Sequence, residues 1–137
     1  MANFILTRTI SAPVDKVWAI GGDFMKTPGP GVEVKVEKRG NGSDNVGAER
    51  TITIGKVKVR ERLETVGPGK TFSYKILSGA PMKDHLARAM FTAKGSYTEI
   101  RWEVAFTPKI PGTGWIIAMV TKKADNQYLD VVAKAAQ

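Results

Sequence analysis

Short turn signals restrict how this chain can fold more than any other feature of its sequence. Examples are "GK" at 55–56, "GPGK" at 67–70 and "KGSY" at 94–97, and they separate segments in which apolar and polar residues alternate. Connections this short leave no room for crossover helices, so neighbouring strands must run antiparallel. We expect seven strands, at residues 4–10, 32–38, 47–54, 56–66, 71–77, 84–93 and 98–108.

Two helical regions interrupt or follow these strands. The segment "SAPVDKVWAI" (11–20) has a proline near its first turn and Ser11 as a candidate N-cap, and the glycines and prolines of 21–31 indicate a loop after it. Residues 113–136 contain no proline, and their only glycine stands at the start. Apolar residues recur there at helical spacing and predict one long amphipathic helix. The predicted stripe is Ile117, Val120, Thr121, Ala124, Tyr128, Val131 and Ala135.

Length and composition predict a soluble protein with one core. The chain has 137 residues, 42% of them hydrophobic and 25% charged, which suits a single domain over residues 1–137. There is no cysteine and only one histidine, so we expect neither a metal site nor a cofactor. The start "MANFILTRTI" does not resemble a secretory signal, and no segment is apolar enough to span a membrane. These features predict a cytoplasmic location.

The net charge of +8 raises the question of nucleic-acid binding. The lysines and arginines, however, are mixed with acids, as in "EVKVEKR" and "RERLE", and no block of like charge occurs. A basic surface without clustered or aromatic-interleaved basic residues predicts no sequence-specific binding of nucleic acid.

Glu61 is the residue that fits the alternating pattern least well. Val57, Val59 and Leu63 share one face of its strand, and Glu61 lies on that same face. Burying a carboxylate among apolar side chains is unfavourable unless a partner satisfies it. Glu61 therefore marks either a polar site or an irregularity of the strand.

The order of elements and three segments resemble the START and birch-pollen-allergen-like superfamily (SRPBCC). "ISAPVDKVWAIGGDF" resembles its opening signature, and "RERLETVGPGKTFSYKILSG" resembles the middle of its polyketide cyclase/dehydrase branch and of the related plant abscisic acid receptors. "TEIRWEVAFTP" resembles its last strand. The resemblance implies an α+β helix-grip fold. In that fold a curved seven-stranded antiparallel sheet wraps a long C-terminal helix, and two short helices follow the first strand.

The resemblance also implies a cavity between sheet and helix, and it places Glu61 in that cavity. In "HLARAM" alternation leaves two inward sets open, and the resemblance favours Leu86, Arg88 and Met90 over Ala87, Ala89 and Phe91. Glu61 then lines the pocket, forms a structural pair with Arg88, or turns outward at a bulge. The ligand-binding residues expected in this way are Val59, Glu61, Phe72, Tyr74, Ile76, Leu86, Arg88, Met90, Trp102, Ile117, Thr121 and Asp125.

Among the remaining candidates, Tyr74 offers a hydroxyl to a ligand or to a core neighbour, and Trp102 is expected to pack on the terminal helix. His85 stands beside a turn, which is typical of a surface histidine. Hormone reception is not expected, because this chain lacks the lysine and the longer gate loop of the plant receptors.

We expect the chain to bind or transport a small hydrophobic or amphipathic molecule, lipid-like or aromatic and polyketide-like, in the cavity. The alternative is a polyketide cyclase or dehydratase-type enzyme that uses Glu61 as general acid or base. A third interpretation, binding of an acidic protein partner, rests only on the basic surface.

Overall fold

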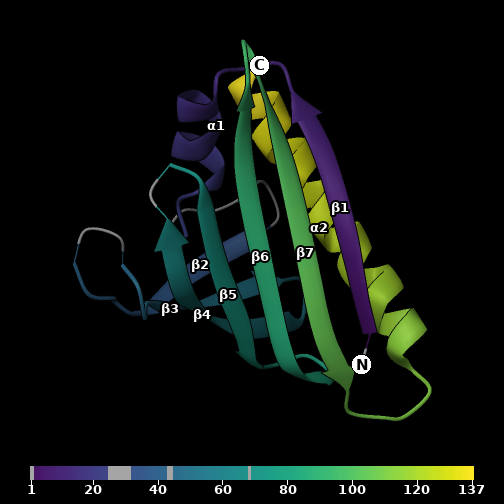
Figure 1. Cartoon of the computed structure of the whole chain (residues 1–137). Helices are drawn as coiled ribbons and strands as arrows, with labels where there is room; N and C mark the ends of the chain where they lie inside the picture. The colour runs from purple at the N-terminus through teal and green to yellow at the C-terminus, as the bar shows by residue number, and fades with distance from the viewer. Residues whose placement is uncertain (1, 25–31, 43–44, 68) are drawn as a thin grey trace.

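The computed structural model describes residues 2–24, 32–42, 45–67 and 69–137. Its strands and helices follow the order expected from the turn signals (Figure 1). The elements are β1 (Ala2–Ile10), α1 (Val14–Gly21), β2 (Val32–Lys38), β3 (Glu49–Ile54), β4 (Val57–Gly67), β5 (Thr71–Ser78), β6 (Met82–Lys94), β7 (Tyr97–Pro108) and α2 (Gly114–Ala136).

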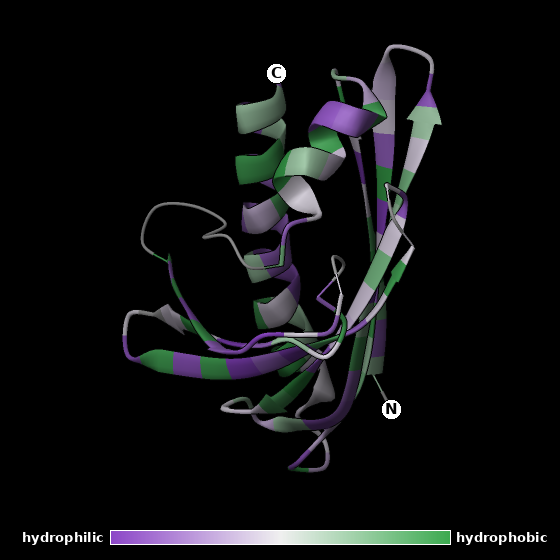
Figure 2. Cartoon of the chain, turned by 90° about the vertical axis from the view of Figure 1, so that its left-hand side faces the viewer, coloured by the Kyte–Doolittle hydropathy of each residue, from purple (hydrophilic) through white to green (hydrophobic). Residues whose placement is uncertain are grey.

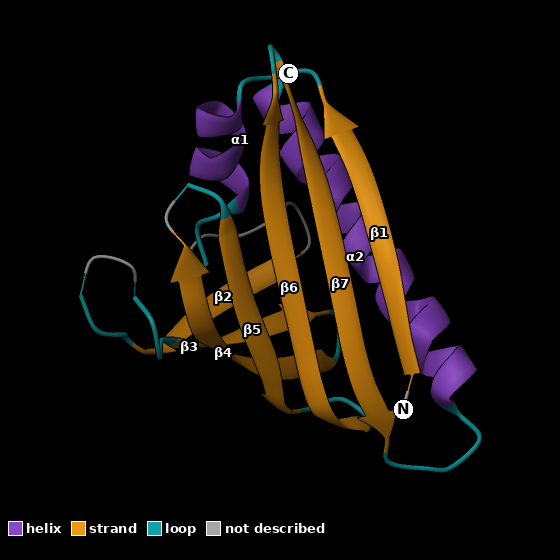
Figure 3. Ribbon diagram, in the orientation of Figure 1, coloured by secondary structure: helices purple, strands orange, loops and turns teal. Residues whose placement is uncertain are grey.

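The seven strands form one sheet in which every neighbouring pair is antiparallel. Their order is β1-β7-β6-β5-β4-β3-β2, so β1 and β2 are the two edges. Helix α2 crosses one face of this sheet behind β1, β6 and β7, as Figure 3 shows. The predicted α+β helix-grip fold, with a seven-stranded antiparallel sheet and a long C-terminal helix, is confirmed.

The sheet is strongly curved. Strands β2, β3 and β4 turn out of the plane of β1, β6 and β7 towards the side on which α2 lies (Figure 2). Register shifts between β4 and β5, at Arg60/Glu61 and at Leu63/Thr65, add residues to one strand without a partner on the other. Such bulges bend a strand and increase its twist, which lets the sheet wrap around the helix.

The β3–β4 hairpin fixes which inward side chains meet. Its turn is Gly55-Lys56, and Gly55 adopts a φ of 60°, a left-handed conformation that glycine accepts without strain. Ile54 is therefore opposite Val57, and the regular register that follows places Arg50 opposite Glu61. The hairpin thus brings two charged side chains together on the concave face.

Only part of the prediction for the first helical region is confirmed. Helix α1 begins after Pro13 with no side-chain cap, so the expected role of Ser11 is wrong. Proline fixes its own φ at a value compatible with the start of a helix, and the Pro13 carbonyl oxygen accepts hydrogen bonds from the Lys16 and Val17 backbone N–H groups at 3.1 Å. The second short helix was expected in the segment before β2, and 25–31 of that segment lie outside the described residues.

The stripe with which α2 packs on the sheet only partly matches the predicted one. Val120 is 61% exposed, and Ala124 and Ala135 are exposed as well. The inward stripe instead includes polar positions, which the apolar periodicity alone cannot detect. The inward residues are Ile117, Thr121, Asp125, Tyr128, Leu129, Val132 and Ala136.

Candidate functional site

A buried ion pair joins Arg50 of β3 to Glu61 of β4 on the concave face of the sheet. Arg50 Nη2 lies 2.8 Å from Glu61 Oε1, and Arg50 Nε donates to the same oxygen at 2.9 Å. The two side chains are only 11% and 9% exposed. Arg50 Nη1 also donates to the Phe24 carbonyl oxygen at 2.7 Å, and the guanidinium lies 3.8 Å from the centre of the Phe24 ring. Glu61 faces inward because Arg50, which our sequence analysis did not identify, satisfies it.

The predicted inward positions of Leu86, Arg88 and Met90 are wrong. Leu86 and Arg88 are exposed and Met90 is only half-buried, whereas Ala87, Ala89 and Phe91 are buried. Arg88 lies opposite Ser73 and Glu103 in the sheet, on the face away from α2. The pair between Glu61 and Arg88 therefore does not form.

A bulge near the start of β6 explains the change of phase and buries His85. The register shifts between Lys83 and Leu86, and Asp84 has a φ of 52°. Beyond this bulge the odd-numbered residues point inward, so His85 is 2% exposed, contrary to the surface position we expected. Its Nδ1 accepts a hydrogen bond from the Ile76 backbone N–H at 3.0 Å. Burial lowers the pKa of His85 to about 4, so the imidazole is neutral at physiological pH.

Aromatic rings line the concave face beside this pair. Phe72 and Tyr74 project from β5, and Trp102 projects from β7. The Trp102 ring centre lies 5.7 Å from that of Phe72, 6.1 Å from that of Tyr74 and 5.4 Å from that of Tyr128 on α2. Between Phe72 and Trp102, β6 contributes Ala89, which is opposite both of them. Large rings of two strands thus converge over a small residue of the strand between them.

Asp125 of α2 adds a second acid to this interior. Burial, reinforced by the negative charge of Glu61, raises the pKa of Asp125 to about 8. The pKa of Tyr74 is also raised well above 10, by burial and by the charges of Asp125 and Glu61. Asp125 is therefore largely protonated at neutral pH, when its carboxyl group can donate as well as accept a hydrogen bond.

Two buried polar atoms of this interior have no hydrogen-bond partner among the described residues. They are Trp102 Nε1 and Asp125 Oδ2. The Tyr128 hydroxyl, in contrast, is occupied, because it donates to the Gly21 carbonyl oxygen at 2.5 Å and ties α2 to α1. Burial raises the pKa of Tyr128 to about 12. Unpartnered buried polar atoms are rare in proteins, so Trp102 and Asp125 mark a place where a further molecule is expected.

The remaining predicted site residues lie on the same concave side. Val59 and Ile76 are half-buried on β4 and β5, Ile117 is buried on α2, and Thr121 is half-buried one turn before Asp125. Their role in ligand binding stays a prediction, as does the cavity between sheet and helix. Besides Arg50 and His85, our sequence analysis did not assign Phe24 or Tyr128 to the site.

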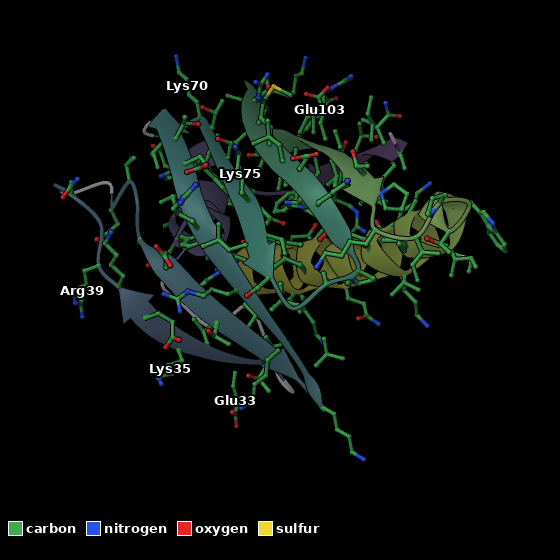
Figure 4. The ribbon with its side chains drawn as sticks, turned by 90° about the horizontal axis from the view of Figure 1, so that it is seen from below. Glu33, Lys35, Arg39, Lys70, Lys75 and Glu103 are labelled. Carbon is green, nitrogen blue, oxygen red and sulfur yellow. The ribbon has the colours of Figure 1, made fainter. Side chains whose placement is uncertain are left out.

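The outer face of the sheet is charged and contains an open hollow of about 650 Å³. Side chains of β2, β3 and β4 line it, including Glu33, Lys35, Thr51 and Lys58. Figure 4 shows this end of the molecule with Glu33 and Lys35 on β2. The hollow lacks aromatic side chains, and its charges are of both signs. We therefore place the candidate site on the concave face.

Two features typical of other functional classes are missing from the described part of the chain. It holds no group of three or more His, Asp or Glu side chains arranged to bind a metal ion. Neither α1 nor α2 has the length and apolar character that crossing a bilayer requires.

The chain belongs to the family described as polyketide cyclase / dehydrase and lipid transport, whose model matches residues 1–135. The family supports a ligand-binding role of the SRPBCC type. Comparison with curated protein sequences gave no match.

Solved structures share the fold at low sequence identity. XoxI from Bacillus cereus superposes with a TM-score of 0.83 at 17% identity, over 99% of this chain and 96% of that one. Norcoclaurine synthase from Thalictrum flavum, in complex with dopamine and hydroxybenzaldehyde, gives 0.74 at 14% identity, over 97% and 84%. The di-domain ARO/CYC BexL from the BE-7585A biosynthetic pathway gives 0.77 at 16% identity, over 98% and 46%.

Proposed function

We propose that the protein binds or carries a small amphipathic molecule between its sheet and α2. The molecule has an apolar, preferably aromatic body and one neutral oxygen group. The observation that carries the proposal is the pair of buried, unpartnered polar atoms, Trp102 Nε1 and Asp125 Oδ2, within an aromatic interior.

The polar atoms define the oxygen group of the ligand. Trp102 Nε1 only donates, and a neutral Asp125 donates or accepts, so a ligand hydroxyl or carbonyl oxygen is a suitable partner for each. Leaving a buried donor or acceptor unpaired costs about 1–3 kcal/mol, which a ligand with such an oxygen recovers. A carboxylate ligand is disfavoured, because it would need a positive partner. Among the described residues Arg50 is the cation of this interior, and it is already paired with Glu61.

The aromatic rings define the body of the ligand. Phe72, Tyr74 and Trp102 offer faces and edges to a flat apolar group, and such contacts add to the burial of apolar area. The family's lipid-transport description agrees with this chemistry, and so do the dopamine and hydroxybenzaldehyde bound by norcoclaurine synthase, which are both aromatic.

Binding of 2-naphthol and of naphthalene, followed by NMR titration, tests the proposal. Both probes carry the same rings, and only 2-naphthol has the hydroxyl group. Trp102→Phe should weaken 2-naphthol binding about 3–10-fold relative to naphthalene, the value of one hydrogen bond. Trp115→Phe, on the exposed side of α2, is the matched control and should change neither affinity. If neither probe binds, or if Trp102→Phe affects both alike, the proposed recognition of the oxygen group is wrong.

A second function is favoured by one observation, the neutral acid in the interior. With a pKa of about 8, Asp125 can donate a proton at neutral pH to a ligand carbonyl oxygen while solvent water takes the proton from the adjacent carbon, and so promote enolisation. We assign this role to Asp125 rather than Glu61, because the Glu61 carboxylate is held by Arg50.

Deuterium exchange at the carbons next to the carbonyl of 2-tetralone tests the enzymatic alternative. The wild-type protein should accelerate the exchange in D₂O, and Asp125→Asn should remove the acceleration, while the exposed-site variant Arg88→Met should keep it. Exchange no faster than in buffer alone would contradict the enzymatic alternative and would leave the binding proposal unaffected.

A further inference from the structure

The first turns of α2 and the loop before it expose a cluster of large apolar side chains. Trp115 is 69% exposed and Val120 is 61% exposed, whereas Ile117 on the inward side is 9% exposed. We call this cluster the apolar patch, and its residues are Ile110, Trp115, Ile116, Met119 and Val120.

Helical geometry gathers these side chains on one face. Trp115 and Met119 are four residues apart, as are Ile116 and Val120, so they form two adjacent rows. Ile110 is held beside the first turn, because its carbonyl oxygen accepts hydrogen bonds from the Thr113 backbone N–H and from Thr113 Oγ1, at 3.3 and 2.6 Å. Figure 1 shows this end of α2 and its loop at the margin of the molecule, near the N-terminus.

Positive charge borders the apolar patch. Lys109 precedes it, and Lys122 and Lys123 follow it by less than one helical turn. All three lysines are exposed, and residues 109–124 contain no aspartate or glutamate. An exposed tryptophan among aliphatic side chains, edged by lysines, is the pattern of a surface that enters the boundary region of a bilayer.

We propose that the apolar patch inserts into the surface of a membrane that contains anionic lipids. The lysines then lie at the level of the headgroups, where each contributes about fivefold to the affinity. The net charge of +8 attracts the whole protein to the same surface.

The rest of α2 sets how far the helix enters. The exposed face continues beyond Lys123 with Gln127 and Asp130, and Asp130 pairs with Arg8 at 2.5 Å. These polar groups stay in water, so only the N-terminal half of α2 and its loop enter. The molecule therefore docks end-on rather than with α2 lying flat.

A second copy of the chain fits this patch less well than a membrane. In a twofold dimer the same patch faces itself, which brings six lysines together without an acid from residues 109–124 to balance them. An anionic lipid surface supplies the missing negative charge.

Sedimentation with lipid vesicles tests the proposal. At low ionic strength the protein should bind phosphatidylcholine vesicles that contain about 30% phosphatidylserine, bind pure phosphatidylcholine weakly, and dissociate as salt is added. Trp115→Ser with Met119→Ser should abolish binding, and Tyr97→Ser, an exposed aromatic residue at the β6–β7 turn, should not. Thermal melts of each variant establish that it is folded.

Two double variants that remove the same charge distinguish attraction by the lysines beside the apolar patch from attraction by the net charge of the whole protein. Lys122→Gln with Lys123→Gln should weaken binding to the anionic vesicles about 30-fold, from the fivefold contribution of each lysine. Lys70→Gln with Lys94→Gln removes the same charge from exposed turns away from the patch and should weaken it less than about twofold.

Three results would overturn the proposal: no binding to anionic vesicles at low salt, equal binding by the Trp115/Met119 variant, or equal losses in the two lysine pairs. Analytical ultracentrifugation supplies the competing outcome. A wild-type dimer that the Trp115/Met119 variant loses, without vesicle binding, would assign the patch to a second copy of the chain.

Discussion

Strands β3 and β4 carry an arginine–glutamate pair on each of their two faces. On the concave face Arg50 and Glu61 approach to 2.8 Å with side chains 11% and 9% exposed. On the outer face Arg60 and Glu49 approach to 2.7 Å, with side chains 42% and 15% exposed. The residue types, the strands and the distances agree, and only the surroundings differ. Burial therefore decides what each pair contributes to stability and what it does.

The outer pair is one of several on that face. Arg60 also lies near Glu37, Arg62 pairs with Glu64, and Lys75 lies near Glu64 as well. Water solvates and screens such pairs, so each contributes little. The concave pair is buried and contacts the Phe24 ring, and an unpaired charge in such surroundings is very unfavourable.

The largest expected effect comes from breaking the buried pair. Arg50→Met leaves the Glu61 carboxylate buried without its partner, which should destabilise the protein by about 3–5 kcal/mol near neutral pH. Urea denaturation gives the free energy of unfolding. Glu61→Gln in the same chain should recover much of the loss, because no charge then remains buried. Equal losses with and without Glu61 would show that the two side chains do not interact.

Asp125 should give the next largest effect, and its sign depends on pH. Its folded pKa of about 8 lies above the ordinary value of 3.8, so the folded state holds the proton more strongly and stability falls as pH rises from 4 to 8. Asp125→Asn cannot ionise and should be more stable than wild type by about 3 kcal/mol at pH 6, with little difference at pH 4. Thermal or urea unfolding across this range measures the difference, and a constant difference would contradict a buried, neutral Asp125.

His85 should show the opposite pH dependence with a smaller effect. Its folded pKa of about 4 lies below 6.5, so its contribution is present above pH 6.5 and is lost as pH falls towards 4. His85→Leu leaves the Ile76 N–H without its acceptor and should cost about 1–3 kcal/mol at pH 7.5. The loss should vanish near pH 4, where wild-type His85 is itself destabilising.

His85→Gln is the matched control for this prediction. Its amide oxygen can accept from Ile76, so the stability at pH 7.5 should be largely retained while the dependence on pH disappears. Loss of stability to the same extent as in His85→Leu would mean that the hydrogen bond to Ile76 is not the important contact.

The smallest effects should come from the outer face. Arg60→Ala removes an exposed pair with Glu49 and should change the free energy of unfolding by no more than about 1 kcal/mol. Arg88→Met should stay within about 0.5 kcal/mol, because Arg88 is exposed. A loss above 2 kcal/mol in either variant would remove the contrast between the two faces.

The sequence was sufficient to predict the fold, because alternation, turn signals and helical periodicity agree over most of the chain. The same alternation and turn signals also predict the Arg50–Glu61 pair. Arg50 alternates with Ile52 just as Glu61 alternates with Val59, and a two-residue turn that pairs Ile54 with Val57 must pair Arg50 with Glu61. Counting back from the "GK" turn would have identified Arg50 instead of Arg88 as the partner.

Alternation alone does not predict which residues of β6 point inward. Both inward sets of "HLARAM" contain apolar residues, and a bulge at Asp84 reverses the phase between Met82 and His85, both of which are buried. Such a bulge depends on the pairing with β5 and β7, which no local pattern encodes. Apolar periodicity does not reveal polar inward positions of α2, such as Asp125, because it counts only apolar residues.

The central claim is that the concave face around Trp102 and Asp125 receives an amphipathic ligand. The indole N–H proton resonances of Trp18, Trp102 and Trp115, assigned by single Trp→Phe variants, test it most directly during titration with 2-naphthol. We predict that the Trp102 resonance shifts downfield and saturates as its Nε1 gains a partner, while the Trp115 resonance stays in place. A Trp102 resonance that does not move while that of Trp115 does would contradict an interior site.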